Sequence, residues 1–155
     1  MASTDLQQLA RSVRGECMAL RVRQLSRRIT RIYDTALRPH GVSTAQLNVL
    51  VALALANDAR PTDIAQALAL EKSTLSRNLE RMVARGWVEV RSGEQGTTQR
   101  LRLLPAGRRV IEEAMPAWRA AQRQAAAELR PDLVASLRGI EGPTPANPPA
   151  RRRRS

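Results

Sequence analysis

Apolar residues recur every three or four positions in the first part of the chain, which is the spacing of one face of an α-helix. The pattern predicts one long helix from Asp5 or Leu6 to Leu37, ended by Pro39 and Gly41. Its apolar stripe consists of Met18, Val22, Leu25, Ile29, Ile32 and Ala36.

A second helix is predicted from Ser43 to about Ala56. Ser43 and Gln46 fit a capping box, in which each side chain satisfies a free amide at the start of the helix. This segment is apolar nearly all round, so we expect it to be buried. Thr62 is placed to cap a short third helix over 63–68.

A fourth helix is predicted from Lys72 to Arg85, with Gly86 as its C-cap. Its apolar set is Leu75, Leu79, Met82 and Val83, and Leu79 and Met82 lie on the same, inward side as Leu75. After Gly86 the period changes to two, over Trp87–Arg91 and Arg100–Leu103, which predicts a β-hairpin with a long polar tip.

Pro105 is suited to begin a fifth helix, which should reach Leu129 and be kinked at Pro116. A short sixth helix is expected over 131–137. The chain after Gly139 is rich in proline and arginine and is expected to be disordered. The predicted fold class is mainly α with a small β-hairpin wing, a winged helix-turn-helix with about six helices.

The formal net charge of +12 indicates a polyanionic partner, with nucleic acid ahead of a membrane surface. Without the four arginines of 151–154 the charge is still +8, so the body of the protein is basic too. Nearly all of the cations are arginine, and Lys72 is the one lysine. A genome that favours arginine would give the same bias, and the charge alone does not separate these explanations.

The 155 residues include one cysteine and one histidine, far apart in sequence, and no Gly-rich phosphate loop follows a strand. Catalysis needs convergent acids, bases, nucleophiles or metal ligands, so the sequence indicates no enzyme, metal site or cofactor.

The start of the chain lacks the apolar core of a signal peptide, and no apolar run could span a bilayer. We therefore expect a cytoplasmic protein with no membrane partner.

The face of the fourth helix opposite Leu75 carries hydroxyl and arginine side chains, a composition that suits entry into the major groove of duplex DNA. A solvated polar face is the alternative. The preceding helix and the following hairpin favour DNA. The candidate DNA-binding residues are Thr62, Lys72, Ser73, Thr74, Ser76, Arg77, Arg81, Arg91, Thr97, Thr98 and Arg100.

Three stretches in this order and spacing resemble the multiple antibiotic resistance regulator (MarR) family. They are LSRRITRIYDTALRPHGVSTAQLNVLVALA from Leu25, PTDIAQALALEKSTLSRNLERMVARGWVEV from Pro61 and LLPAGRRVIEEAMPAW from Leu103. The resemblance implies a homodimeric winged-helix repressor that binds palindromic double-stranded DNA through the fourth helix and the wing. It also implies relief of repression by small phenolic or other ligands, or by oxidants.

The resemblance implies a division into four parts: a dimerisation helix over 1–40, a DNA-binding lobe over 41–104, dimerisation helices over 105–138 and a disordered tail over 139–155. The wing departs from the family pattern, because residues 94–98 carry no arginine at the tip. Arg91 and Arg100 flank this loop and can substitute. Leu104 replaces the usual threonine before the fifth helix, which removes an N-cap.

Relatives that sense organic hydroperoxides carry a reactive cysteine on the first helix, and the alignment puts that position at Ala19. Cys17 would lie about 200° away around a continuous helix. Arg14 and Arg21 could lower its pKa, whereas Glu16 opposes this. An oxidant sensor at Cys17 and a passive, partly buried thiol are both open.

The resemblance also implies a ligand cleft between the dimerisation region and the DNA-binding lobe. Candidate lining residues for a small aromatic effector are Arg21, Tyr33, His40, Met115 and Trp118, with Arg28 as a further anion partner. The simpler interpretations are an exposed His40 and a Trp118 in the core or at the dimer contact.

Two further alternatives concern partners. A winged helix with an unusual tip could bind a protein or RNA instead of duplex DNA. The run of 151–154 could add DNA affinity through counterion release, or could be an inert tail.

Overall fold

The computed structural model describes residues 2–56, 58–92 and 98–140, with side chains from Asp5 onward. These residues form seven α-helices, a short 3₁₀-helix and a two-stranded antiparallel sheet. The elements are α1 (Ala2–Glu16), α2 (Met18–Leu37), η1 (Arg38–His40), α3 (Thr44–Ala56), α4 (Pro61–Ala67), α5 (Lys72–Ala84), β1 (Val88–Ser92), β2 (Gln99–Leu103), α6 (Pro105–Ala127) and α7 (Pro131–Arg138). The predicted winged-helix fold class is confirmed. The predicted disordered tail lies outside the described residues, apart from its first two.

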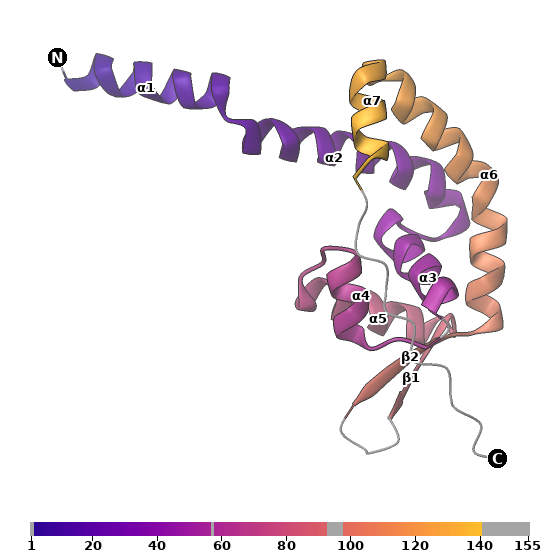
Figure 1. Ribbon diagram of the computed structural model, residues 1–155. Helices are drawn as coiled ribbons and strands as arrows, with labels where there is room; N and C mark the ends of the chain where they lie inside the picture. The colour runs from indigo at the N-terminus through magenta and orange to yellow at the C-terminus, as the bar shows by residue number, and fades with distance from the viewer. Residues whose placement is uncertain (1, 57, 93–97, 141–155) are drawn as a thin grey trace.

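The terminal helices and the hairpin lie at opposite ends of the molecule (Figure 1). α2, α6 and α7 form one end, and α4, α5 and the hairpin form the other, with α3 between them. α1 projects away from this body, continuing from the start of α2 (Figure 1).

The prediction of one unbroken first helix is wrong. Cys17 has an extended backbone, with φ −65° and ψ 103°, so that α1 ends at Glu16 and α2 begins at Met18. Gly15 weakens the helix just before this point, because glycine costs about 1 kcal/mol relative to alanine in a helix. The break raises the number of helices from six to seven. The expected rotation of about 200° between Cys17 and Ala19 assumed a continuous helix and does not apply.

The start of α3 is fixed by its neighbours in sequence and in space. The amide of Ser43 donates to Gln46 Oε1 at 3.1 Å, and the amide of Gln46 donates to Ser43 Oγ at 3.3 Å, so the capping box is confirmed. The Thr44 amide and hydroxyl both donate to Asp34 Oδ1. These bonds tie α3 to α2.

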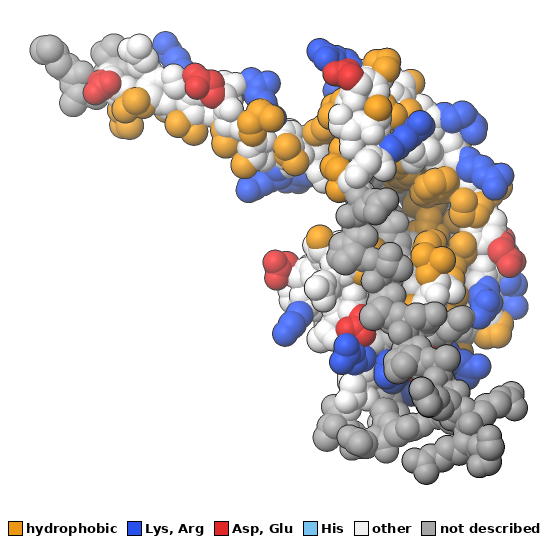
Figure 2. All heavy atoms as spheres, viewed as in Figure 1, with side chains coloured by type: hydrophobic (Ala, Val, Ile, Leu, Met, Phe, Trp, Pro, Cys, Tyr) orange, Lys and Arg blue, Asp and Glu red, His pale blue; other side chains and the backbone are white. Residues whose placement is uncertain are grey.

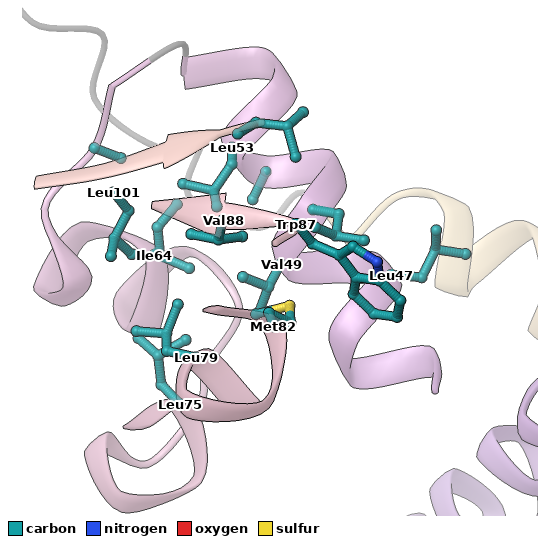
Figure 3. Packing of buried hydrophobic residues seen from close by; sticks show 14 of the residues in the cluster. Leu47, Val49, Leu53, Ile64, Leu75, Leu79, Met82, Trp87, Val88 and Leu101 are labelled. Carbon is teal, nitrogen blue, oxygen red and sulfur yellow. The ribbon is translucent and has the colours of Figure 1, made fainter. Parts of the chain in front are cut away.

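The hydrophobic core lies between α3, α4, α5 and the hairpin (Figure 3). α3 supplies much of it, although Val51 and Leu55 are exposed, so the expectation of burial all round was too broad. Leu75, Leu79 and Met82 of α5 are buried as predicted. Val83, the fourth apolar residue of this helix, is 42% exposed.

α5 ends in a Schellman motif that starts the hairpin. Gly86, with φ +66°, donates its amide to the Val83 carbonyl, and the Trp87 amide donates to the Met82 carbonyl. Trp87 then packs beside the buried Met82 (Figure 3). The end of α5 and the start of β1 are thus held in one fixed geometry.

The hairpin pairs Val88 with Leu103 and Ser92 with Gln99 at its two limits. The middle of β2 gains a third, very short partner segment, because Ala59 and Leu101 exchange both backbone hydrogen bonds. α6 packs closely on the root of the hairpin at Gly107, where a Cβ atom would stand 2.5 Å from the Trp87 carbonyl oxygen. The helix runs through Pro116 and curves over α3 and α2 (Figure 1).

Candidate nucleic-acid interface

The outward face of α5 carries the side chains predicted to contact DNA. Lys72, Ser73, Ser76, Arg77 and Arg81 are exposed, whereas the opposite face packs into the core. Thr74 is half-buried on the flank. Among the described residues, Arg77 and Arg81 form no ion pair, so both guanidinium groups remain available. This face offers hydroxyls near the start of the helix and cations further along.

The hairpin brings a second group of predicted residues to the same end of the molecule. Arg91 and Thr98 are exposed and Arg100 is half-buried. Arg91 lies 3.9 Å from Glu89, measured between Nε and Oε2. Thr97 and most of the wing tip lie outside the described residues.

Thr62 does not cap the third predicted helix. The helix begins at Pro61, two residues earlier than predicted, and Arg60 occupies the N-cap without a side-chain capping bond. Proline is well suited to the first helical position, which explains the earlier start. Thr62 is exposed near the start of α4.

Sequence reasoning missed an ion pair beside the hairpin. Arg60 donates from Nε and Nη2 to the two carboxylate oxygens of Asp63, each at 2.9 Å. This hydrogen bonding lowers the pKa of Asp63, and the charge of Arg100 lowers it further. The spacing Arg-Pro-Thr-Asp could have suggested the pair, whereas the proximity of Arg100 depends on the contact between residues 59 and 101.

The structure brings together only part of the predicted ligand site. The rings of Tyr33 and Trp118 lie 6.4 Å apart between their centroids, and the Tyr33 hydroxyl donates to Gln122 Oε1. Burial raises the pKa of Tyr33. Met115 is half-buried one turn before Trp118.

Arg21 lies away from this pair. Arg21 donates to the Gly15 carbonyl at the helix break, roughly 18 Å along α2 from Tyr33 at 1.5 Å per residue. His40 is exposed in η1. Arg28 pairs with Glu128 at 2.7 Å on the rim of a shallow hollow of about 280 Å³ between α2 and α6.

Cys17 is half-buried at the break between α1 and α2. Within the described part of the chain, no group of three or more His, Cys, Asp or Glu residues is placed to hold a metal ion. No helix among the described residues has the length and apolar character needed to cross a membrane.

Comparisons with known proteins place these features in a family. The model of the MarR family matches residues 40–96. The chain is similar to the Mycobacterium tuberculosis transcriptional regulator MosR, solved in complex with DNA, with 30% identity and a TM-score of 0.70 over 79% of this chain and 92% of that one. No curated protein matches at a significant level.

Two other solved structures share the fold. A probable transcriptional regulator from Pseudomonas aeruginosa is 25% identical, with a TM-score of 0.71 over 81% of this chain and 94% of that one. A mutant of Escherichia coli MarR complexed with operator DNA is 21% identical, with a TM-score of 0.72 over 82% and 92%. The family match and the similarity to MosR over nearly its full length agree with the exposed recognition helix and hairpin, and the chain belongs to the MarR family of DNA-binding, winged-helix transcriptional regulators.

Proposed function

We propose that the protein binds duplex DNA sequence-specifically as a homodimer and represses transcription at an imperfect palindrome. The observation that carries the DNA-binding part is the outward face of α5, where Ser73, Ser76, Arg77 and Arg81 are exposed beside the hairpin. Arginine can bind guanine through two hydrogen bonds, and serine can contact bases or phosphates. The solved complexes of MosR with DNA and of E. coli MarR with operator DNA support the same partner for this chain.

Apolar side chains on the terminal helices support the homodimer. Large apolar residues of α1 and α2 are exposed in the single chain, and Leu137 and Ile140 at the other terminus are exposed as well. A lone helix of about 15 residues is only marginally stable in water, so α1 needs a surface to pack on. The exposed residues of α1 and α2 are Leu6, Leu9, Val13, Met18 and Val22.

A two-fold dimer sets the form of the operator. Two α5 helices related by the dyad would enter successive major grooves, with their centres about 34 Å apart. The two half-sites would therefore be related by a palindrome with a spacing of about one helical turn.

The Tyr33–Trp118 pair supports a small aromatic effector. The two half-buried rings join α2 to α6, so a ligand that inserts between them would shift these helices relative to each other. DNA would be released only if the ligand prefers the conformation that does not fit the operator. Titration with salicylate-like compounds should give a saturable change in tryptophan fluorescence that is lost in Trp118→Phe. No saturable change with any of them would count against the effector.

Fluorescence anisotropy tests DNA recognition. The duplex is taken from the upstream region of the protein's own gene and compared with a scrambled duplex over a salt series. We expect tighter binding to the first duplex. In Arg77→Ala, affinity should fall by about 1–3 kcal/mol, with relaxed preference at one base pair in each half-site.

Arg119→Ala is the matched control, because Arg119 is an exposed arginine of α6 away from α5. It should change affinity little. Equal binding of wild-type protein to both duplexes would contradict sequence-specific recognition.

A further inference from the structure

Three arginines lie opposite one another across the hairpin, close to its loop end. Arg91 of β1 and Arg100 of β2 are direct Cα partners in the sheet. Ala59 pairs with Leu101 through both backbone hydrogen bonds, and the next residue, Arg60, keeps an extended backbone with φ −78° and ψ 147°. The antiparallel register therefore puts Arg60 opposite Arg100 on its other side. We call Arg60, Arg100 and Arg91 the arginine row.

The arginine row faces away from the core. Ala59 and Leu101 are fully buried, and successive residues of a strand point to opposite faces. The row therefore lies on the outer face, where the Arg60 side chain is 52% exposed and that of Arg91 is 57% exposed.

Like charges directly opposite each other destabilise a sheet, so the row has an electrostatic cost in the free chain. The described acidic groups that pair with it are few. Asp63 binds Arg60, and Glu89 lies 3.9 Å from Arg91. Three cations against two carboxylates leave a net positive charge on an exposed surface, which an anion from outside the chain would neutralise.

Asp63 fixes the position of one member of the row. Its side chain is only 17% exposed, and both of its oxygens accept hydrogen bonds from Arg60, so the guanidinium group is held in a defined plane. Asp63 is also close enough to Arg100 for that charge to lower its pKa. The carboxylate thus holds Arg60 and lies within electrostatic range of Arg100.

The hairpin lies at the same end of the molecule as α5 (Figure 1), and Lys and Arg side chains are visible at this end as well as over the rest of the face in the space-filling view (Figure 2). We propose that the arginine row binds the phosphate backbone of duplex DNA beside the groove entered by α5, with Arg60 as a phosphate contact and Asp63 as the residue that positions it. This inference rests on the proposed DNA-binding function. It gives the wing a cationic contact next to its tip, whereas the tip itself carries no arginine.

A phosphate contact has a specific thermodynamic signature. Each neutralised phosphate of duplex DNA contributes a slope of about −0.9 to the dependence of log affinity on log salt concentration. Arg60→Ala should therefore make the slope about one unit shallower and weaken binding to the upstream and scrambled duplexes by the same factor. A base contact would instead lower the preference between the two duplexes.

The experiment measures anisotropy titrations of both duplexes over a salt series for wild type, Arg60→Ala, Arg91→Ala and Arg119→Ala. Arg119→Ala removes the same charge from α6 and should keep the wild-type slope. Arg91→Ala removes a second arginine of the row, one that is not bound to Asp63 of α4. Thermal melts followed by circular dichroism show whether each variant is folded.

The outcomes separate this inference from the proposed function. A shallower slope in Arg60→Ala and Arg91→Ala, with unchanged preference between duplexes, supports the arginine row. If wild type prefers the upstream duplex but both folded variants show the same salt slope as Arg119→Ala, the phosphate contact by the arginine row is refuted and the proposed function stands. If wild-type protein binds neither duplex, both are overturned.

Discussion

The lobe of residues 41–103 and the arm of residues 2–22 differ in how their apolar side chains are covered. Those of the lobe are largely buried in the single chain, whereas those of the arm are exposed. In the lobe, side chains from α3, α4, α5 and the hairpin are buried within a single chain, together with Leu37 of α2 and Ala114 of α6. In the arm, Leu9, Val13 and Met18 are between 58% and 69% exposed. The difference teaches that the core of the lobe is closed within one chain, whereas the arm is complete only when another surface covers it.

The largest effect on stability is expected from a cavity in the lobe. Leu50 of α3 is fully buried, so Leu50→Ala should lower the free energy of unfolding by about 2–5 kcal/mol. Urea denaturation followed by circular dichroism measures this. Leu55→Ala is the matched control on the same helix, because Leu55 is 68% exposed. Equal losses in the two variants would break the distinction between the two faces of α3.

The close contact between α6 and the hairpin root gives the next largest effect. In Gly107→Ala the new methyl group would meet the Trp87 carbonyl oxygen at 2.5 Å and Leu103 Cδ1 at 2.7 Å. Overpacking of this kind typically costs about 1–3 kcal/mol, which outweighs the better helix propensity of alanine. Gly15→Ala, with open space around the Cβ position, should be neutral or stabilising. A more stable Gly107→Ala protein would show that α6 can move off the hairpin.

Loss of the capping box at α3 should have a smaller effect. Ser43→Ala removes the acceptor for the Gln46 amide and should cost about 1 kcal/mol. Ser43→Asp, which retains a capping oxygen, should recover most of the loss. Thermal melts of the two variants measure this, and equal melting temperatures would refute a capping role for the hydroxyl.

The smallest effect on the lobe is expected from changes in the arm. Leu9→Ser combined with Val13→Ser should leave protection of α3 amides from hydrogen exchange within about 0.5 kcal/mol of wild type, since exposed positions contribute little to the free energy of the lobe. The same variant should lose pairing between chains. Strong deprotection of α3 would mean that the lobe depends on the arm after all.

Local patterns in the sequence predicted the inner face of α5, its end at Gly86 and the capping of α3. The three-to-four spacing of Leu75, Leu79 and Met82 located the inner face of α5, and the positive φ of Gly86 agrees with its assignment as a C-cap. The Ser43–Gln46 box was also visible as a spacing of three residues. Each of these features depends on residues that are close in the chain, so periodicity and capping rules apply directly.

Other errors occurred where the structure depends on contacts between residues far apart in the sequence, or on the absence of such contacts. The break at Cys17 follows a single glycine in a segment that projects from the body, and helical periodicity passes through it unchanged. Arg60 was missed as a neighbour of the predicted Arg91 and Arg100, because the pairing of Ala59 with Leu101 joins residues far apart in sequence. Arg21 and Tyr33 were both assigned to the ligand cleft, although they lie far apart along α2.

Sedimentation velocity of the protein with the upstream duplex tests most directly whether the lobe binds DNA and the arm pairs the chains. The wild-type complex should contain two 17.1 kDa chains per duplex, and the Leu9→Ser/Val13→Ser variant alone should sediment as a single chain. A wild-type protein that sediments as one chain, both free and on the duplex, would contradict the account.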